Sequence, residues 1–320
     1  MNLSPLICPV CETPLTWSAK ECRCANGHSF DPAKEGYLNL LLSHQRRSAH
    51  PGDDAAMIQA RRRFFDSGAY SPLKELIAKS ATETKSSWAP RMRGNEVAIS
   101  NHQSPISILD CGCGEGTFLG ALSKMLPQSG SVGDVAPPLN SEPIGRASLS
   151  ERAAQLFGID ISKEAIRCAA KRYKDASWIV ANGMRKLPFA DSSMDVILSI
   201  LAPRNPEEFA RVLKPDGKLI LGVPGPNHLI ELRSQLAANA GDFEEKADEA
   251  AAKCAPLFSE SHRELLSYQQ TLSAEQIADL IQMTPIFWCS SPEAKECIRK
   301  LDQLKITVSF TLLMLQATNH

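Results

Sequence analysis

The sequence predicts an α/β protein, built on a doubly wound parallel sheet with a small metal-binding unit in front of it. A short apolar run over 106–109 leads directly into closely spaced glycines, and apolar runs and amphipathic stretches then alternate along the chain. Such alternation favours a parallel sheet with helices on both faces and a ligand at the carboxyl ends of the strands. Cysteines and a histidine cluster within the first thirty residues, which predicts the metal-binding unit.

Composition sets limits on size, charge and location. A chain of 320 residues with 43% hydrophobic residues can build one large domain and a smaller unit. The formal net charge of −1 provides no global attraction to nucleic acid, so any such contact must come from a local patch. No apolar run approaches the ~20 residues needed to span a bilayer, and the amino terminus lacks the basic start and apolar core of an export signal. We therefore expect a cytoplasmic protein without a membrane partner.

The first element is a metal site with the spacing C-x2-C-x12-C-x3-H, formed by Cys8, Cys11, Cys24 and His28. Three thiolates and one imidazole complete a tetrahedral zinc site with no open position, which is typical of structural zinc. Cys22 competes with Cys24 for the third position, but the resulting C-x5-H spacing is a poorer match. Reduced cysteines that are merely neighbours are the alternative. Because so short a segment buries little apolar surface, it would depend on the ~10–16 kcal/mol that structural zinc supplies.

Two helices and a linker are expected over 51–105. Asp53 or Asp54 can cap the first helix, Gly68 suits its end, and Ser71–Pro72 starts the second. The composition after residue 82 then becomes that of a linker.

Charge is unevenly spread over 34–63, where six basic residues, three of them at Arg61–Arg63, face three acidic ones. This modest patch fits either phosphate contact with RNA or a solvated helix face, and charge alone does not decide between them.

The glycine-rich stretch has the form Asp-x-Gly-x-Gly-x-Gly, with Asp110, Gly112, Gly114 and Gly116 as its fixed positions. Glycines let a ligand approach the backbone, and the following helix directs free N–H groups at it. The spacing is neither the G-x-G-x-x-G of dinucleotide folds nor a P-loop. It resembles the first motif of S-adenosylmethionine (SAM) methyltransferases. An ordinary strand-to-helix turn is the alternative.

Asp160 is expected to end the next strand, where its carboxylate can accept hydrogen bonds from both ribose hydroxyls of SAM. The alternative is a surface aspartate at the start of a helix. The acidic residue of such folds usually follows the glycine turn by ~20 residues, whereas Asp110 and Asp160 are fifty positions apart. We attribute the excess to an inserted, disordered surface loop over 127–152. Asn182, at the end of a third strand, could hydrogen-bond adenine.

The expected domain division is a zinc-binding unit over 1–50, connecting helices and linker over 51–105, and a cofactor domain over 106–320. The expected elements of the last are strands 106–110, 155–160, 177–181, 194–200 and 217–223, helices 117–126, 162–173 and 206–213, and a closing antiparallel strand 305–315.

A more specific resemblance rests on the order of three features. After the cysteine–histidine set, residues 29–42 read Ser-Phe-Asp-Pro-Ala-Lys-Glu-Gly-Tyr-Leu-Asn-Leu-Leu-Leu. The glycine loop follows further along the chain. The chain thereby resembles the large-subunit (23S) ribosomal RNA guanine-N1 methyltransferase family. That family opens with a Cys-Pro-x-Cys zinc ribbon, continues through a similar Lys-Glu-Gly-Tyr segment and carries a SAM-binding domain. The resemblance covers most of the chain, including Pro224–Leu229.

The resemblance implies a SAM-dependent enzyme of rRNA processing, with a Rossmann-like methyltransferase domain and a zinc ribbon, that methylates N1 of a guanine in a 23S rRNA hairpin. It implies cofactor contacts from Tyr70, Gly114, Glu115 and His228. No residue is identified as the base that removes the N1 proton, and a homodimer is left open. The rival interpretations are a SAM methyltransferase acting on a small molecule such as a quinone precursor, and a zinc-ribbon RNA-binding protein with a vestigial cofactor domain.

Overall fold

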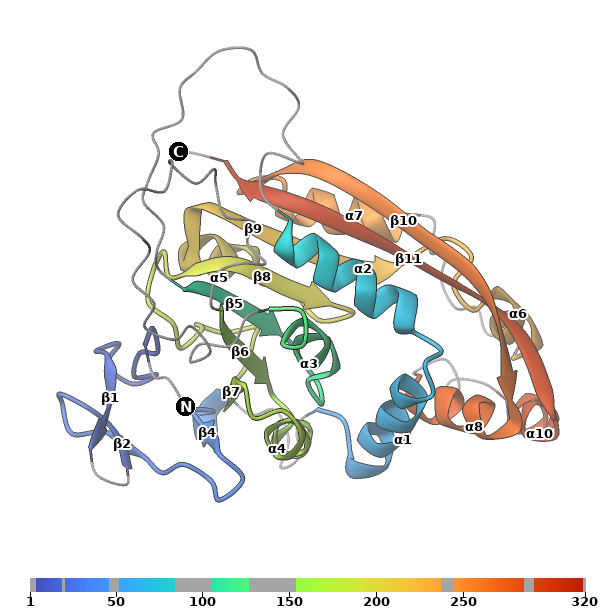
Figure 1. Cartoon of the computed structure of the whole chain (residues 1–320), viewed down its shortest axis with the longest axis horizontal. Coiled ribbons are helices and arrows are strands. Elements are labelled where there is room, and N and C mark those ends of the chain that lie inside the picture. Colours follow the sequence, from blue (N-terminus) through green and yellow to red (C-terminus); the bar gives the residue numbers. More distant parts are fainter. Residues whose placement is uncertain are drawn as a thin grey trace, which may run out of the picture.

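The computed structural model describes residues 4–18, 21–45, 52–83, 105–126, 154–236, 245–284 and 291–318 (Figure 1). The linker predicted to start at residue 82 lies outside the described residues from residue 84 onward, and so does the predicted insertion over 127–152.

A small antiparallel sheet forms the amino-terminal unit. Its strands are β1 (Leu15–Ser18), β2 (Glu21–Cys24) and β3 (Ser29–Phe30), in the order β1-β2-β3. The segment before β1 is attached to the large domain, because Ile7 N–H donates to the Pro188 carbonyl and Leu6 forms an isolated bridge with Phe189. Leu6 is 1% exposed, so this attachment is also part of a hydrophobic core.

The large sheet contains eight strands among the described residues. Their bounds are β4 Tyr37–Asn39, β5 Ile106–Cys111, β6 Ala154–Asp160, β7 Ala176–Val180, β8 Met194–Ile200, β9 Leu213–Pro224, β10 Phe258–Ser273 and β11 Gln303–Ala317. They lie in the order β10-β11-β9-β8-β5-β6-β7-β4. The pairs from β9 through to β4 are parallel, and β11 is antiparallel to both β9 and β10. The predicted doubly wound sheet and its antiparallel closing strand are confirmed.

Two strands differ from the sequence expectations. β4 lies within the range assigned to the zinc-binding unit, yet it pairs in parallel with β7 at the edge of the large sheet. β10 was not predicted; it forms the opposite edge and runs alongside β11 (Figure 1). The domain division itself stays a prediction.

Several helices begin at a polar residue whose side chain accepts one of the first free backbone N–H groups. Asp54 accepts from Met57 N–H at the start of α1, and Ser162 does the same for α4. Ser273 and Gln276 form a capping box at α8. The bounds are η1 (a 3₁₀ turn) Ser43–Gln45, α1 Ala55–Asp66, α2 Ser71–Thr82, α3 Thr117–Leu122, α4 Lys163–Arg172, α5 Pro206–Val212, α6 Ile230–Gln235, α7 Lys246–Cys254, α8 Ala274–Met283 and α10 Pro292–Arg299.

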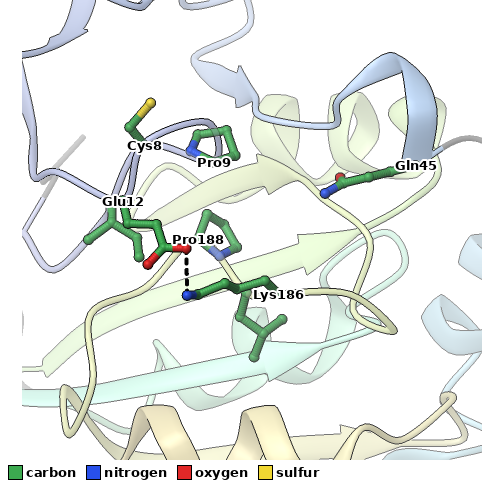
Figure 2. A pocket seen from close by; sticks show the side chains of 8 residues that line it. Cys8, Pro9, Glu12, Gln45, Lys186 and Pro188 are labelled. Atoms are coloured by element: carbon green, nitrogen blue, oxygen red, sulfur yellow. Dashed lines mark ion pairs between the residues drawn. The ribbon is translucent and has the colours of Figure 1, made fainter. Parts of the chain in front are cut away.

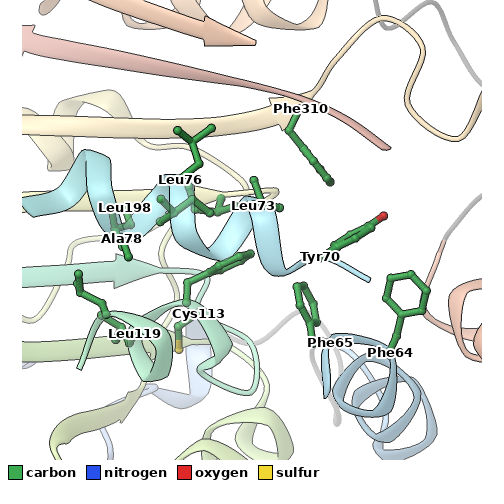
Figure 3. Close-up of a cluster of buried hydrophobic side chains, with 14 of the residues drawn as sticks. Phe64, Phe65, Tyr70, Leu73, Leu76, Ala78, Cys113, Leu119, Leu198 and Phe310 are labelled. Atoms are coloured by element: carbon green, nitrogen blue, oxygen red, sulfur yellow. The ribbon is translucent and has the colours of Figure 1, made fainter. Parts of the chain in front are cut away.

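Side-chain alternation along the strands divides the apolar residues between two cores. In β5, Ile106 and Ile108 pack with α2 and α3, whereas Leu109 and Cys111 pack with α5, α7 and the amino-terminal segment. Figure 3 shows the first core, where α2 lies across the sheet and aromatic rings gather around Tyr70. The ring centroids of Tyr70 and Phe310 are 5.3 Å apart in an edge-to-face arrangement. Both faces of the sheet are covered, so its carboxyl edge is left to build a site.

No described helix combines the length and the apolar composition that crossing a membrane would require.

Candidate active site and metal centre

The four predicted zinc ligands lie together. One ligand atom from each of Cys8, Cys11, Cys24 and His28 falls within 4.8 Å of all the others. The Nδ1 atom of His28 lies 3.3 Å from the sulfur of Cys24 and 3.7 Å from that of Cys8. Hydrogen bonds with Thr13 lower the pKa of Cys11 to about 5, which favours the thiolate that binds metal. This donor set fits a closed, structural zinc site.

Cys22 lies outside this group of four. Its side chain is fully buried, and burial raises its pKa to about 11. Cys24 sits two residues further along β2, so its side chain points to the same face of the strand but nearer to the turn that carries His28.

The glycine loop follows β5, and all three of its glycines have left-handed backbone angles. The φ values are 85° at Gly112, 55° at Gly114 and 82° at Gly116. A Cβ at Gly112 would lie 2.4 Å from the Ala202 methyl, and a Cβ at Gly116 would lie 2.4 Å from the Trp178 ring. The nearest atom to a Cβ at Gly114 would be Nη1 of Arg61 at 3.5 Å, an ordinary contact distance, so this position is less crowded than the other two.

Asp110 carries a buried carboxylate at the end of β5. The residue is 1% exposed, and neither carboxylate oxygen has a hydrogen-bond partner among the described residues. Burial, followed by the nearby charges of Asp160 and Glu115, raises its pKa to about 8. An unpartnered buried carboxylate is costly, so a cationic ligand at this position would stabilise it.

Asp160 ends β6 and holds the loop from the other side. Its two oxygens accept hydrogen bonds from Gly114 N–H at 3.0 Å and Ser162 N–H at 2.8 Å. Each carboxylate oxygen can accept more than one hydrogen bond, so the group retains capacity for hydroxyl donors. Burial raises the pKa of Asp160, while these two backbone hydrogen bonds oppose the change.

Arg61 is a residue of this site that the sequence did not assign. Its guanidinium forms an ion pair with Asp53 and lies 3.9 Å from the Glu115 carboxylate. Asp53 is held in turn, because its carbonyl accepts a hydrogen bond from the Ser162 hydroxyl at 3.1 Å. The start of α1 therefore packs over the glycine loop. Asp53 precedes α1, whose N-cap is Asp54, so helical spacing along the chain provides no signal that Asp53 and Arg61 meet.

The other arginines of α1 are also paired. Arg63 donates to both carboxylate oxygens of Asp279 on α8, and Arg62 lies 4.0 Å from Asp66. The structure therefore does not favour the interpretation of this helix as a basic stripe for RNA phosphates.

Tyr70 and His228 form a buried pair near the end of β9. The Tyr70 hydroxyl lies 3.5 Å from His228 Nε2, and His228 Nδ1 accepts the Ser309 N–H at 3.3 Å. A neutral imidazole that accepts at Nδ1 carries its proton on Nε2, facing the tyrosine. Burial lowers the pKa of His228 to about 3, so the ring is neutral at physiological pH.

Asn182 follows β7 beside the amino-terminal unit. Its amide donates to the Gln45 carbonyl at 3.2 Å, and its carbonyl oxygen accepts from Met184 N–H at 3.0 Å. These bonds tie the end of β7 to the segment after β4. The predicted adenine contact of Asn182 stays a prediction.

A hollow lies between the zinc-binding unit and the loop after Asn182 (Figure 2). The Lys186 ammonium and the Glu12 carboxylate form an ion pair of 2.6 Å across it. Its lining comes from both units, at Ile7, Cys8, Pro9, Glu12, Gln45, Lys186, Leu187 and Pro188. The metal centre is thus fixed against the large domain.

Comparisons with known proteins agree with both units. The family described as "RlmA, N-terminal", a zinc ribbon, matches residues 6–49, and the family described as "Methyltransferase domain" matches residues 144–221. The chain is 31% identical to the 23S rRNA (guanine(748)-N(1))-methyltransferase of Streptomyces fradiae, over 96% of this chain and 94% of that protein. It is 32% identical to a protein of Bacillus subtilis assigned as a 23S rRNA (guanine-N(1)-)-methyltransferase, over 98% of each chain. The chain belongs to the 23S rRNA (guanine-N1)-methyltransferase family.

Among solved structures, a geranyl diphosphate methyltransferase in complex with SAM is 12% identical, covers 87% of this chain and 96% of its own, and has a TM-score of 0.41.

Membership of the guanine-N1 methyltransferase family confirms the predicted resemblance. It also confirms the fold class, a Rossmann-like SAM-dependent methyltransferase domain with an amino-terminal zinc ribbon.

Proposed function

We propose that this protein transfers the methyl group of SAM to N1 of one guanine in a hairpin of 23S ribosomal RNA. The observation that carries the proposal is the extent of the similarity: relatives assigned that activity match over 96–98% of the chain, ribbon and methyltransferase domain together. A small-molecule methyltransferase would have no need of the ribbon, and an RNA-binding protein with a vestigial cofactor domain would have no need of Asp110 and the glycine loop.

The proposed cofactor site lies at the carboxyl edge of the sheet. Asp110 offers a buried carboxyl group without a hydrogen-bond partner among the described residues, and the sulfonium or ammonium charge of SAM would favour its ionised form. Asp160 has remaining acceptor capacity for the ribose hydroxyls. The proposed contacts comprise Tyr70, Asp110, Gly112, Gly114, Glu115, Gly116, Asp160, Asn182 and His228.

Methyl transfer from a sulfonium depends mainly on alignment. The bound cofactor supplies an electrophilic methyl carbon, and the protein must hold the guanine N1 in line with it. Asp110 and Asp160 end two neighbouring strands of the sheet, and the glycine loop is tied to Asp160 by the Gly114 N–H, so the sheet positions the proposed cofactor contacts. N1 of neutral guanine carries a proton that must leave. We assign no base to this step.

The ribbon is proposed to hold the RNA in a fixed direction relative to the cofactor. Backbone hydrogen bonds of 3.0 Å, from Ile7 N–H to the Pro188 carbonyl and from Ala190 N–H to the Pro5 carbonyl, join the ribbon segment to the large domain. The net charge of −1 favours recognition by shape over bulk electrostatics. A target base must leave its stack to be reached, which favours a hairpin loop. We propose a cytoplasmic location, which accords with an RNA substrate. The homodimer stays a prediction, and light scattering would test it.

The test uses the methyl group itself. A methyl on N1 blocks Watson–Crick pairing, so reverse transcriptase should stop at the modified guanine in 23S rRNA from cells that contain the protein. The stop should vanish in a deletion strain and return with the wild type but not with Gly114→Arg, whose side chain would crowd the glycine loop. Identical stops in both strains, together with labelled methyl appearing in a small-molecule extract, would contradict the proposal.

A further inference from the structure

Two leucines at the carboxyl edge of the sheet have left-handed backbone angles, which bulky residues rarely adopt. Leu201 follows β8 and Leu229 precedes α6, each with φ of 54°. Leu229 is 1% exposed, so burial of its side chain accounts for the conformation. The Leu201 side chain is 48% exposed and gains no comparable burial. A strained backbone without a packing gain is characteristic of functional sites.

The backbone at Leu201 is held by its neighbours on two sides. Its N–H donates to the Gly222 carbonyl on β9 at 2.9 Å. The next residue, Ala202, places its methyl where a side chain on Gly112 would be. Because Ala202 lies against Gly112, the backbone at Leu201 is next to the glycine loop, at the end of the strand that neighbours β5.

This position is the switch point of the sheet. The chain proceeds from β5 outward to β6 and β7 on one side, and to β8 and β9 on the other. Ligands of doubly wound sheets bind in the crevice at such a point. The proposed cofactor contacts Asp110, Gly114 and Asp160 occupy the β5–β6 side, which leaves the β8 side for the second reactant.

We infer that Leu201 is the apolar surface against which the target guanine packs before methylation, and hence a specificity-determining residue. The inference rests on the proposed function. A flipped base is commonly held by packing on an apolar side chain, and Leu201, an exposed leucine whose neighbour Ala202 lies against the glycine loop, provides such a face. A residue with an ordinary, negative φ at this position would direct its side chain elsewhere. The need to present the leucine to the base would therefore explain the strained backbone angle of Leu201.

The test compares Leu201→Gly, Leu201→Met and the wild type. Glycine adopts the same backbone angle without strain, so Leu201→Gly should fold at least as stably as the wild type. It should bind SAM within about twofold of the wild-type affinity but lose at least tenfold in kcat/KM for the rRNA hairpin. Leu201→Met keeps an apolar side chain and should stay within about threefold. Ser192→Gly is the matched control, because Ser192 has φ of 49° in an exposed turn and should change neither measurement.

Three outcomes would overturn the inference. Leu201→Gly that methylates RNA with wild-type kcat/KM would show that the side chain is not needed. Leu201→Gly that loses SAM affinity in step with activity would place the residue with the cofactor instead. Wild type that methylates no guanine in the hairpin would refute the proposed function, and the inference with it; that failure is recognised in the wild type before any variant is made.

Discussion

Asp110→Asn replaces a buried ionisable group with a neutral one of nearly the same shape. The folded-state pKa of Asp110 is about 8, above its ordinary value of 3.8, because burial disfavours the charged form. Between these two values the unfolded chain has lost the proton and the folded chain retains it. The free energy of unfolding therefore falls as pH rises through this interval and levels off above it. Asparagine has no proton to lose, so the variant lacks this contribution.

The size of the effect follows from the raised pKa. Each pH unit is worth about 1.4 kcal/mol while the two states differ by one proton. Between about pH 6 and about pH 8, wild type without cofactor should thus lose about 2 kcal/mol of unfolding free energy relative to Asp110→Asn. Urea denaturation of both proteins at several pH values measures this difference directly.

SAM binding should lower the pKa of Asp110 again, since a cationic ligand favours the ionised carboxylate. Calorimetric titration near pH 7, in buffers of different ionisation enthalpy, should detect more proton release on SAM binding for wild type than for Asp110→Asn. The variant should also bind SAM at least tenfold more weakly at about pH 8. Parallel stability profiles for the two proteins, or equal proton release, would refute the assignment of Asp110 as a buried acid poised for a cation.

Three further changes test the remaining parts of the site. Cys24→Ser should lose zinc while Cys22→Ser retains it, as metal analysis of the purified proteins would show; the reverse pattern would exchange their roles. Gly116→Ala should lower the unfolding free energy by about 3 kcal/mol or more, because its methyl would overlap a tryptophan ring, whereas Gly114→Ala should cost only the ~1 kcal/mol of backbone strain; equal losses in denaturation would contradict this. Asp160→Ala should weaken SAM binding at least tenfold in calorimetry, since hydrogen bonds to a charged acceptor contribute about 1.5–3 kcal/mol each; unchanged affinity would place the ribose acid elsewhere.

Sequence patterns anticipated the elements that depend on neighbours along the chain. The strand expected at 194–200 has those bounds in the structure, and Asp54, one of the two candidate caps, does cap α1. The role of the positive charge at Arg61–Arg63 was ambiguous because it depends on residues that are distant in the sequence. A run of arginines shows that positive charge is present, but two of the carboxylates that pair with it, Glu115 and Asp279, lie on distant parts of the chain.

By itself, the sequence determined the strands and helices over 106–223, the glycine loop and the spacing of the candidate zinc ligands, because periodicity, turn chemistry and ligand spacing are all local properties. Only the tertiary structure decided which distant segments meet. It pairs Tyr37 with Trp178, places Tyr70 against His228 and sets Ala202 against Gly112. Such contacts join segments that are far apart in the sequence, so no short stretch of sequence contains both partners.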